Sequence, residues 1–413
     1  MIQSTDRKSS TLPSFPGTSF IGQEEEQAVL EVLRSGELFR YHGNKEHPSK
    51  CDLLEQHFAK HTGASHVLAV TSGTAALICA LQGIGVGPGD EVIVPAYTWL
   101  ATAAAVLAVN GIPIVAEVDE SLTLDPADVE AKITPYTKAI IVVHMRGAPS
   151  QMDELLAIAK RRGLKLIEDT AQANGGSYRG RRLGALGDAG CFSLQLSKII
   201  TAGEGGILIT SDDNVWKRAL MFHDVPGGER QGITKDEILW GINFRMPELL
   251  AAVALAQLGK LESILTNLRA RKQMLKGGME EVAQRKGITF RAIPDAEGDT
   301  GATLIFFAPD AAQADQIARK LQEANIGAGL MYHPDRSDYH VYAHWLPVLE
   351  QRTWTEAGGP WRWAQRDIQY HKEMCPRSLE LLGRAINMNI DPLMSNDEME
   401  ELIEGVNQVL DQI

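Results

Sequence analysis

The sequence predicts an α/β protein in which a mostly parallel sheet is flanked by helices, followed by a smaller α+β region. Three observations support this fold class. Five apolar runs are nearly continuous in Val, Ile, Leu and Ala, as expected of strands that are buried on both faces. Helical patterns alternate with them. No internal repeat or low-complexity block interrupts the order. The runs are 66–71, 91–94, 112–118, 139–145 and 164–168.

Apolar spacing and stop signals predict the helices around this sheet. One helix covers 22–36 and ends at a glycine, and a second covers 50–62. Another begins at Ser72, and an alanine-rich stretch, 96–109, is expected to be a core helix. Residues 152–162 form a helix between two strands. The remaining elements are strands at 188–194 and 205–211, a long helix over 245–285, strand character over 288–309 and helices at 310–324 and 395–413.

The order of these elements predicts two domains after a loose arm. Residues 1–20 form the arm, 21–285 the large domain and 286–413 the small C-terminal domain. An aromatic-rich insertion occupies about 333–375 of the small domain. A chain of 413 residues is long enough for this division.

Composition and charge narrow the possible functions. The net charge of -13 argues against nucleic acid or an anionic membrane as a partner. The first residues are polar and lack the apolar stretch of a signal peptide, which predicts a cytoplasmic protein. The four cysteines are scattered without metal-type pairing, so buried free thiols are expected and no metal site is predicted.

Lys198 lies in the connection between the strands predicted at 188–194 and 205–211. Gly203, Gly205 and Gly206 follow it and allow the backbone to bend and to approach a ligand closely. An amine among apolar neighbours has its charged form disfavoured and becomes nucleophilic, so Lys198 is a candidate Schiff-base lysine. The alternative is a solvated loop lysine.

Two further sites follow predicted strands. Ser72, Gly73 and Thr74 begin a helix, where free backbone N–H groups form a cradle for phosphate. An ordinary helix cap is the alternative for Ser72 and Thr74. Asp169 directly follows the strand predicted at 164–168, so its carboxylate is expected in the ligand crevice of the sheet, where it could keep a pyridine nitrogen protonated. A helix cap is again the alternative.

Trp99 follows the strand at 91–94 and could stack on a flat cofactor, although tryptophans usually fill cores. A phosphate cradle, an acid at a strand end, an aromatic ring and a loop lysine together match the needs of pyridoxal 5'-phosphate (PLP). Its phosphate, ring nitrogen, ring face and aldehyde require these four groups.

The chain resembles the DegT/StrS family of sugar aminotransferases, which are fold-type-I PLP enzymes. The resemblance rests on motifs within about 20–260, among them Thr71-Ser-Gly-Thr-Ala-Ala-Leu77, Ile167-Glu-Asp-Thr-Ala-Gln172 and Gly241-Ile-Asn-Phe-Arg-Met246. It implies a seven-stranded sheet, with Lys198 as the Schiff-base and proton-transfer residue and Asp169 as the partner of the pyridinium. The other implied cofactor-binding residues are Ser72, Gly73, Thr74, Trp99, Gln172, Ser193 and Asn243.

The resemblance also implies a homodimer, because Asn243 is expected to reach the phosphate of the neighbouring subunit. The expected reaction moves an amino group from glutamate or glutamine to a keto or aldehyde carbon of a nucleotide-linked sugar or a cyclitol, in amino-sugar or antibiotic biosynthesis. A PLP- or pyridoxamine-dependent sugar dehydratase is disfavoured, since such relatives replace the lysine by histidine. A non-catalytic PLP-binding regulatory protein is disfavoured because lysine, aspartate, glutamine and serine occur together.

Two features depart from the family pattern. Where the family commonly has His-x-Tyr-Gly, this chain has His144-Met-Arg146-Gly147, which places a cation near the strand ends for an anionic substrate group or a surface ion pair. The segment 333–375 is longer than usual and holds four of the seven tryptophans. It is expected to fold over the mouth of the active site, or else to form a satellite cluster that stabilises the small domain or the dimer.

Overall fold

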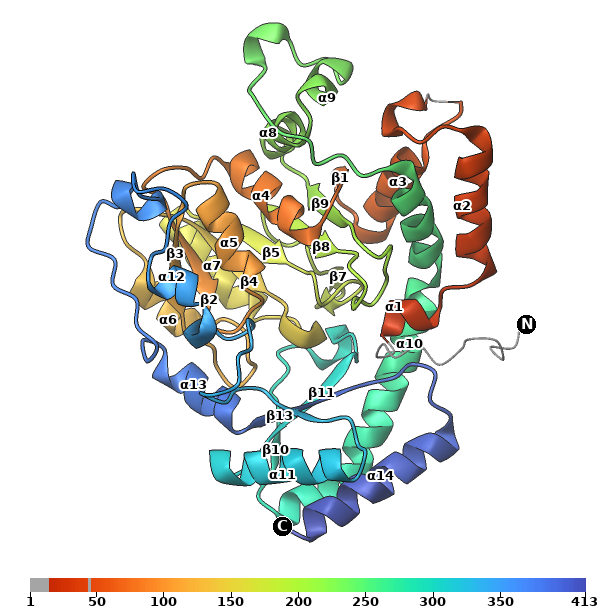
Figure 1. Ribbon diagram of the computed structural model, residues 1–413, viewed down its shortest axis with the longest axis vertical. Coiled ribbons are helices and arrows are strands. Elements are labelled where there is room, and N and C mark those ends of the chain that lie inside the picture. The colour runs from red at the N-terminus through yellow and green to blue at the C-terminus, as the bar shows by residue number, and fades with distance from the viewer. Residues whose placement is uncertain (1–14, 44–45) are drawn as a thin grey trace.

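The computed structural model describes residues 15–43 and 46–413 and has an α/β fold (Figure 1). Its main sheet has seven strands in the order β1-β9-β8-β5-β4-β2-β3. β9 runs antiparallel to β1 and β8, and the other neighbours are parallel. The predicted mostly parallel, seven-stranded sheet is therefore confirmed. The strands are β1 (His66–Val70), β2 (Glu91–Pro95), β3 (Ile112–Ala116), β4 (Thr137–Val143), β5 (Lys165–Asp169), β8 (Ala189–Ser193) and β9 (Gly206–Thr210).

Helices cover both faces of this sheet, because alternate strand residues join different cores. Val92 and Val94 pack with α4 (Gly73–Ile84), α5 (Ala101–Ala108) and α8 (Asp213–His223). Ile93 on the opposite face packs with α6 (Pro126–Lys132) and α7 (Met152–Arg162). At the β1–β9 end, that opposite face packs against α3 (Lys50–Thr62) and α10 (Glu248–Arg285). All strand residues of β2, β3, β8 and β9 are buried, as expected of strands that helices cover on both faces.

A second, antiparallel sheet follows in the order β10-β11-β13-β12. Its strands are β10 (Thr289–Phe290), β11 (Thr303–Phe307), β12 (Gly329–Leu330) and β13 (Ala385–Asn389), with helices α11 (Ala311–Glu323), α13 (Pro376–Gly383) and α14 (Asn396–Asp411). One apolar core contains residues of β9 and of β11 together with the 38-residue helix α10. The two sheets therefore share a core through α10 (Figure 1).

The smaller elements complete the chain. A two-stranded hairpin has β6 (Ser177–Tyr178) and β7 (Arg181–Arg182), and α2 (Gln23–Ser35) packs on α10. The short helices are α1 (Pro16–Ser19), α9 (Val225–Arg230), α12 (Leu346–Leu349), η1 (Arg40–His42), η2 (Met145–Gly147), η3 (Lys235–Glu237), η4 (Ala296–Gly298), η5 (Tyr342–His344) and η6 (Pro360–Trp363).

Two expectations differ from the structure. Residues 15–20 of the predicted loose arm form α1 and its flanks, and the backbone N–H of Gly17 donates to the carbonyl of Lys198 at 3.2 Å; residues 1–14 lie outside the described residues. The alanine-rich helix begins at Ala101 instead of near residue 96. Residues 96–100 form a turn because they bond to the insertion: Thr98 N–H donates to His340 at 2.9 Å and Leu100 N–H to Tyr339 at 2.9 Å.

The aromatic insertion, residues 333–375, contacts a cavity at one end and the main sheet along the rest of its length. His340 reaches the cavity described below. Tyr342 and Trp345 are fully buried in the core of the main sheet. Further along, the Tyr370 hydroxyl donates to the carbonyl of Pro113 on the edge strand β3 at 2.7 Å. One end of the insertion therefore approaches the expected active site, and the rest covers an edge of the sheet.

One helix among the described residues, α10, is long and apolar enough by composition to cross a membrane. In the structure it packs against α2, α3 and α14. The predicted cytoplasmic location stays a prediction.

Candidate functional site

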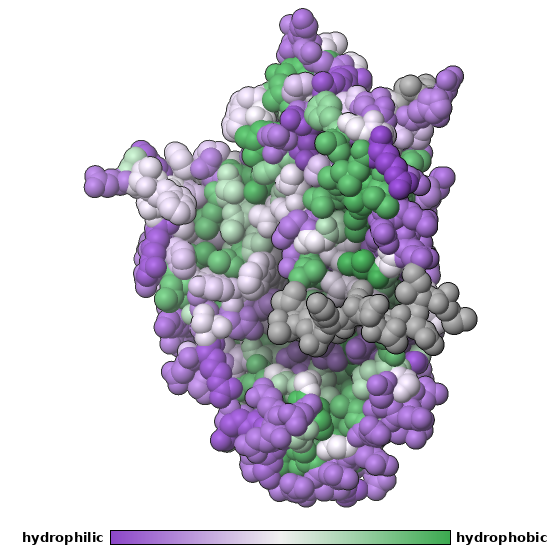
Figure 2. Space-filling view, turned by 45° about the vertical axis from the view of Figure 1, so that its right-hand side comes forward, coloured by the Kyte–Doolittle hydropathy of each residue, from purple (hydrophilic) through white to green (hydrophobic). Residues whose placement is uncertain are grey.

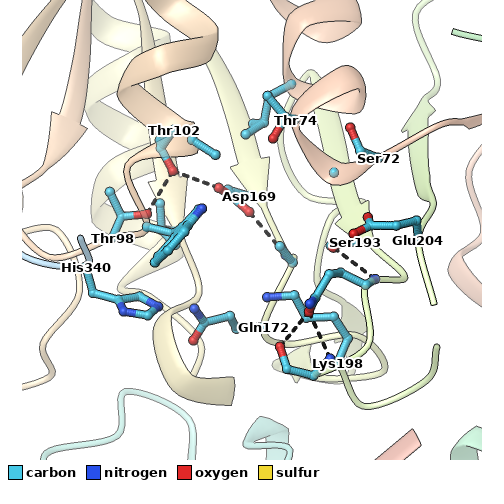
Figure 3. Close-up of a pocket in the computed structure, with 18 residues that line it drawn as sticks. Ser72, Thr74, Thr98, Thr102, Asp169, Gln172, Ser193, Lys198, Glu204 and His340 are labelled. Atoms are coloured by element: carbon cyan, nitrogen blue, oxygen red, sulfur yellow. Dashed lines mark hydrogen bonds between the residues drawn. The ribbon is translucent and has the colours of Figure 1, made fainter. Parts of the chain in front are cut away.

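A cavity of about 380 Å³ lies at the carboxyl ends of the central parallel strands. Ligands of open α/β sheets bind at this edge. Figure 3 shows Asp169 from the end of β5 and Lys198 from the β8–β9 connection pointing into this cavity. The segments that meet here lie far apart in sequence, so the sheet order brings the candidate groups together.

The Lys198 amine has no hydrogen bond or ion pair with any described residue. Its backbone N–H donates to the carbonyl of Gln195 at 3.0 Å, and its carbonyl accepts from Gly17. These bonds fix the backbone while the side chain stays free. Burial lowers the pKa of Lys198, and the nearby Arg146 lowers it further, whereas Asp169 opposes this shift. The neutral, nucleophilic form of the amine is thereby favoured.

Asp169 is 5% exposed and forms no ion pair within the described part of the chain. Its Oδ1 accepts from Ala171 N–H at 3.1 Å and its Oδ2 from the Thr102 hydroxyl at 3.0 Å. Thr98 lies 2.8 Å from Thr102 and extends this chain of hydroxyls. Burial raises the pKa of Asp169, and the two hydrogen bonds and the charge of Lys198 oppose it. A buried carboxylate without a paired cation would be stabilised by a cationic ligand.

The N-terminus of α4 forms another wall of the cavity. The Ser72 side chain caps the helix by accepting from Ala75 N–H at 3.0 Å, so the capping alternative holds for this residue. The N–H groups of Gly73 and Thr74 have no protein acceptor among the described residues, as expected of a first helical turn. A Cβ atom on Gly73 would lie 2.8 Å from the Cβ of Ser193, so only glycine lets the helix end approach β8 this closely.

Trp99 is 48% exposed and lines the cavity, so it does not fill the core. Its ring centroid lies 4.9 Å from that of His340, which comes from the insertion. The His340 Nδ1 contacts Asp338 at 2.7 Å. Burial lowers the pKa of His340, so its ring is favoured in the neutral form. Gln172 also lines the cavity, and its Oε1 accepts from the backbone N–H of Arg146 at 3.2 Å.

The structure brings eight of the nine predicted site residues to one cavity: Ser72, Gly73, Thr74, Trp99, Asp169, Gln172, Ser193 and Lys198. Asn243 is exposed elsewhere on the surface, and its Oδ1 accepts from Arg245 N–H at 3.1 Å. Sequence reasoning missed Thr102 and His340. The spacing Thr98-x-x-x-Thr102 beside an alanine-rich helix could have indicated a buried polar pair. No local signal placed His340.

Comparisons with known proteins cover nearly the whole chain. A model of the DegT/DnrJ/EryC1/StrS aminotransferase family matches residues 19–356. A protein named L-glutamine:2-deoxy-scyllo-inosose aminotransferase from Streptoalloteichus tenebrarius is 34% identical, covering 93% of this chain and 91% of its own. One of the same name from Streptomyces kanamyceticus is 36% identical, covering 93% and 90%. The crystal structure of 3-amino-5-hydroxybenzoic acid synthase superposes with a TM-score of 0.79 at 27% identity, covering 97% and 99%.

Proposed function

The chain belongs to the DegT/DnrJ/EryC1/StrS aminotransferase family, and from this premise we propose that it transfers the amino group of glutamine to the keto carbon of a cyclitol, with PLP as its cofactor. The observation that carries this proposal is the meeting of Lys198 and Asp169 in one cavity. The cyclitol acceptor is supported by the names of the two relatives. The charge of the cavity lining supports it as well. Among the described residues, Lys198 and Arg146 are the lysine and arginine that line the two cavities. Two such cations are too few to bind the diphosphate of a nucleotide in addition to the phosphate of the cofactor.

The residues present fit PLP. Asp169 lacks a paired cation, which a protonated ring nitrogen would supply. The free N–H groups of Gly73 and Thr74, with the hydroxyl of Ser193, would hold the phosphate at the helix N-terminus. The exposed face of Trp99 would cover one side of the ring. When bound, PLP would supply the electron sink for amino transfer.

Each side chain then has a defined task. Lys198 would hold the cofactor through its amine and, once released, take and return the proton at the substrate carbon; its lowered pKa favours the neutral form that this requires. Asp169 would keep the proton on the ring nitrogen, and Thr102 and Ala171 would hold the carboxylate in place. Trp99 and His340 would exclude water from the cavity mouth.

Absorbance spectroscopy of the protein reconstituted with PLP tests this function. We expect a visible band that vanishes in Lys198→Ala, bleaches on addition of glutamine and returns on addition of 2-deoxy-scyllo-inosose. Return with a nucleotide-linked ketosugar alone would refute the cyclitol acceptor. A band that no amino acid bleaches would refute aminotransferase activity.

We further propose that the protein acts as a homodimer. Exposed apolar side chains surround Asn243 on two segments that lie side by side: Arg245 stacks over Phe39 at 5.5 Å, and Glu248 N–H donates to Leu38 at 3.4 Å. Figure 2 shows hydrophobic surface on the face below the tip that carries α9. This patch, Leu38, Phe39, Leu239, Trp240 and Ile242, is of the kind that mediates association, and it would bring Asn243 to a neighbouring subunit.

A further inference from the structure

Arg146 follows β4 and adopts a backbone conformation that side-chain-bearing residues rarely take, with φ of 54°. Such conformations are strained and persist only where the surroundings hold them. Here two contacts do so. The backbone N–H of Arg146 donates to Gln172 Oε1 at 3.2 Å, and its Nε donates to the hydroxyl of the buried Tyr97 at 3.1 Å. The position and direction of the guanidinium are thus fixed.

The guanidinium of Arg146 has no carboxylate partner within the described residues. Asp338 is the acid with an electrostatic effect on it, but its carboxylate accepts from the backbone N–H of His340 at 2.9 Å and lies 2.7 Å from Nδ1 of the His340 ring. Arg40, another largely buried arginine, differs because it pairs with Glu55 at 2.7 Å. The unpaired fork of Arg146 therefore remains available to a ligand.

Arg146 lines a second cavity, of about 250 Å³, which adjoins the first. Lys198, Gln172, His340 and Ser197 line both cavities. On its far side, the second cavity is bounded by residues of the second sheet, including Thr303 and Asn389. A substrate whose reacting carbon lies beside the Lys198 amine would therefore extend toward Arg146.

We propose that Arg146 binds the α-carboxylate of the amino donor. This inference rests on the proposed function, because an α-amino acid carries its carboxylate one bond from the carbon that loses the amino group. A planar guanidinium matches a carboxylate with two parallel hydrogen bonds. The proposed cyclitol acceptor is uncharged, so the donor is the substrate that needs this cation. The same pairing would hold the 2-oxo acid product until it leaves.

Binding of two unreactive probes separates the carboxylate contact from catalysis. Glutaramate is glutamine without its α-amino group, and glutaramide replaces the carboxylate of glutaramate by a neutral amide. Calorimetry on the PLP-loaded protein at fixed salt is expected to show glutaramate binding about 10- to 100-fold more tightly than glutaramide, the range of a charge-assisted pair. Arg146→Gln is expected to abolish this preference and to leave glutaramide binding unchanged. Arg146→Lys keeps the charge without the fork and should retain part of it.

Arg336→Gln is the matched control, because this arginine is exposed and pairs with Asp315 at 3.3 Å away from the cavities. It should keep the full preference for glutaramate. An equal preference in wild type and in both Arg146 variants would overturn the inference. If Arg146→Gln does not fold, the Arg146→Lys variant decides alone, since an unchanged preference there excludes a fork-shaped contact. Failure of the proposed function is distinct: glutamine would then not bleach the wild-type cofactor band at all.

Discussion

The carboxylate of Asp169 is held by two hydrogen bonds, one of them from a threonine hydroxyl that sequence reasoning did not single out. Thr102 is 1% exposed, and Thr98 is close enough to bond to its hydroxyl. A hydrogen bond to the charged form of a carboxyl favours that form. Thr102 therefore acts as a positioning residue for the charge that Asp169 would present to a cofactor.

Replacing Thr102 by Val removes this donor and keeps the shape of the side chain. The pKa of Asp169 should rise further, and PLP should bind about tenfold less tightly, the effect of one charge-assisted hydrogen bond. Titration of the apoprotein with PLP, followed by absorbance, measures the change. Thr266→Val, on the exposed face of α10, is the control and should bind PLP as wild type does. Equal affinities for the two variants would contradict a positioning role.

His223 gives a prediction for stability against pH. Burial, together with the positive charge of Arg40, lowers its pKa to about 3. The unfolded chain binds a proton at this residue below about pH 6.5, and the folded chain does not until about pH 3. Stability is therefore lost as the pH falls from 6.5, by about 1.4 kcal/mol per pH unit from this group. His223→Leu should flatten the acid side of a denaturant-stability profile measured at constant protein concentration. A slope identical to that of wild type would exclude His223 as its source.

At the scale of elements, the N-terminus of α4 at Gly73 packs against the carboxyl end of β8 at Ser193, where the phosphate would lie. Gly73→Ala places a methyl group against Ser193 and should push the two apart. We expect PLP affinity to fall at least about tenfold, with a stability loss of about 1–3 kcal/mol from overpacking. Gly87→Ala, which has open space around its Cβ position, should change neither quantity. The measurements are cofactor titration and thermal unfolding. Wild-type affinity in Gly73→Ala would show that the close approach is not needed.

The elements that local patterns govern were predicted well. The helix expected at 50–62 coincides with α3, because Ser49 caps one end and Gly63, with φ of 78°, ends the other. The hairpin of β6 and β7 likewise turns locally, at Arg179 and Gly180, with φ of 48° and 77°. These features depend on neighbours in sequence, so the sequence displays them.

The turn that carries Trp99 could not be predicted in this way. Its residues look helical in sequence, and hydrogen bonds to Tyr339, His340 and Tyr342 of the insertion hold them in another form. Placement of His340 in the cavity depends on the same long-range pairing. The clustering of the site residues was predictable as a set through family resemblance, whereas tertiary contacts such as those of Arg146 and Thr102 required the structure.

At the scale of the molecule, the exposed patch around Asn243 predicts association. Trp240 is 76% exposed, and Trp240→Glu should weaken a dimer by about tenfold or more in dissociation constant, because buried interface aromatics are frequent hot spots. Sedimentation velocity over a range of concentrations measures this. Cofactor retention should fall in parallel if Asn243 contacts the phosphate of a partner subunit. Trp354→Glu changes another exposed tryptophan, in the insertion, and should leave the dimer intact. A monomeric wild type would contradict the proposal.

The core that α10 shares between the two sheets limits how this chain can be recombined with its relatives. A crossover near residue 286 would join a foreign β11 and β13 to α10, where Leu304 and Ile386 belong to the same apolar cluster as Leu261 and Ile207. Chimeras that exchange everything after 286 would therefore have mismatched side chains where this helix meets β11 and α14. Grafting a new acceptor specificity onto this scaffold should succeed more often when the side chains of α10 that face β11 and α14 are exchanged together with the C-terminal segment.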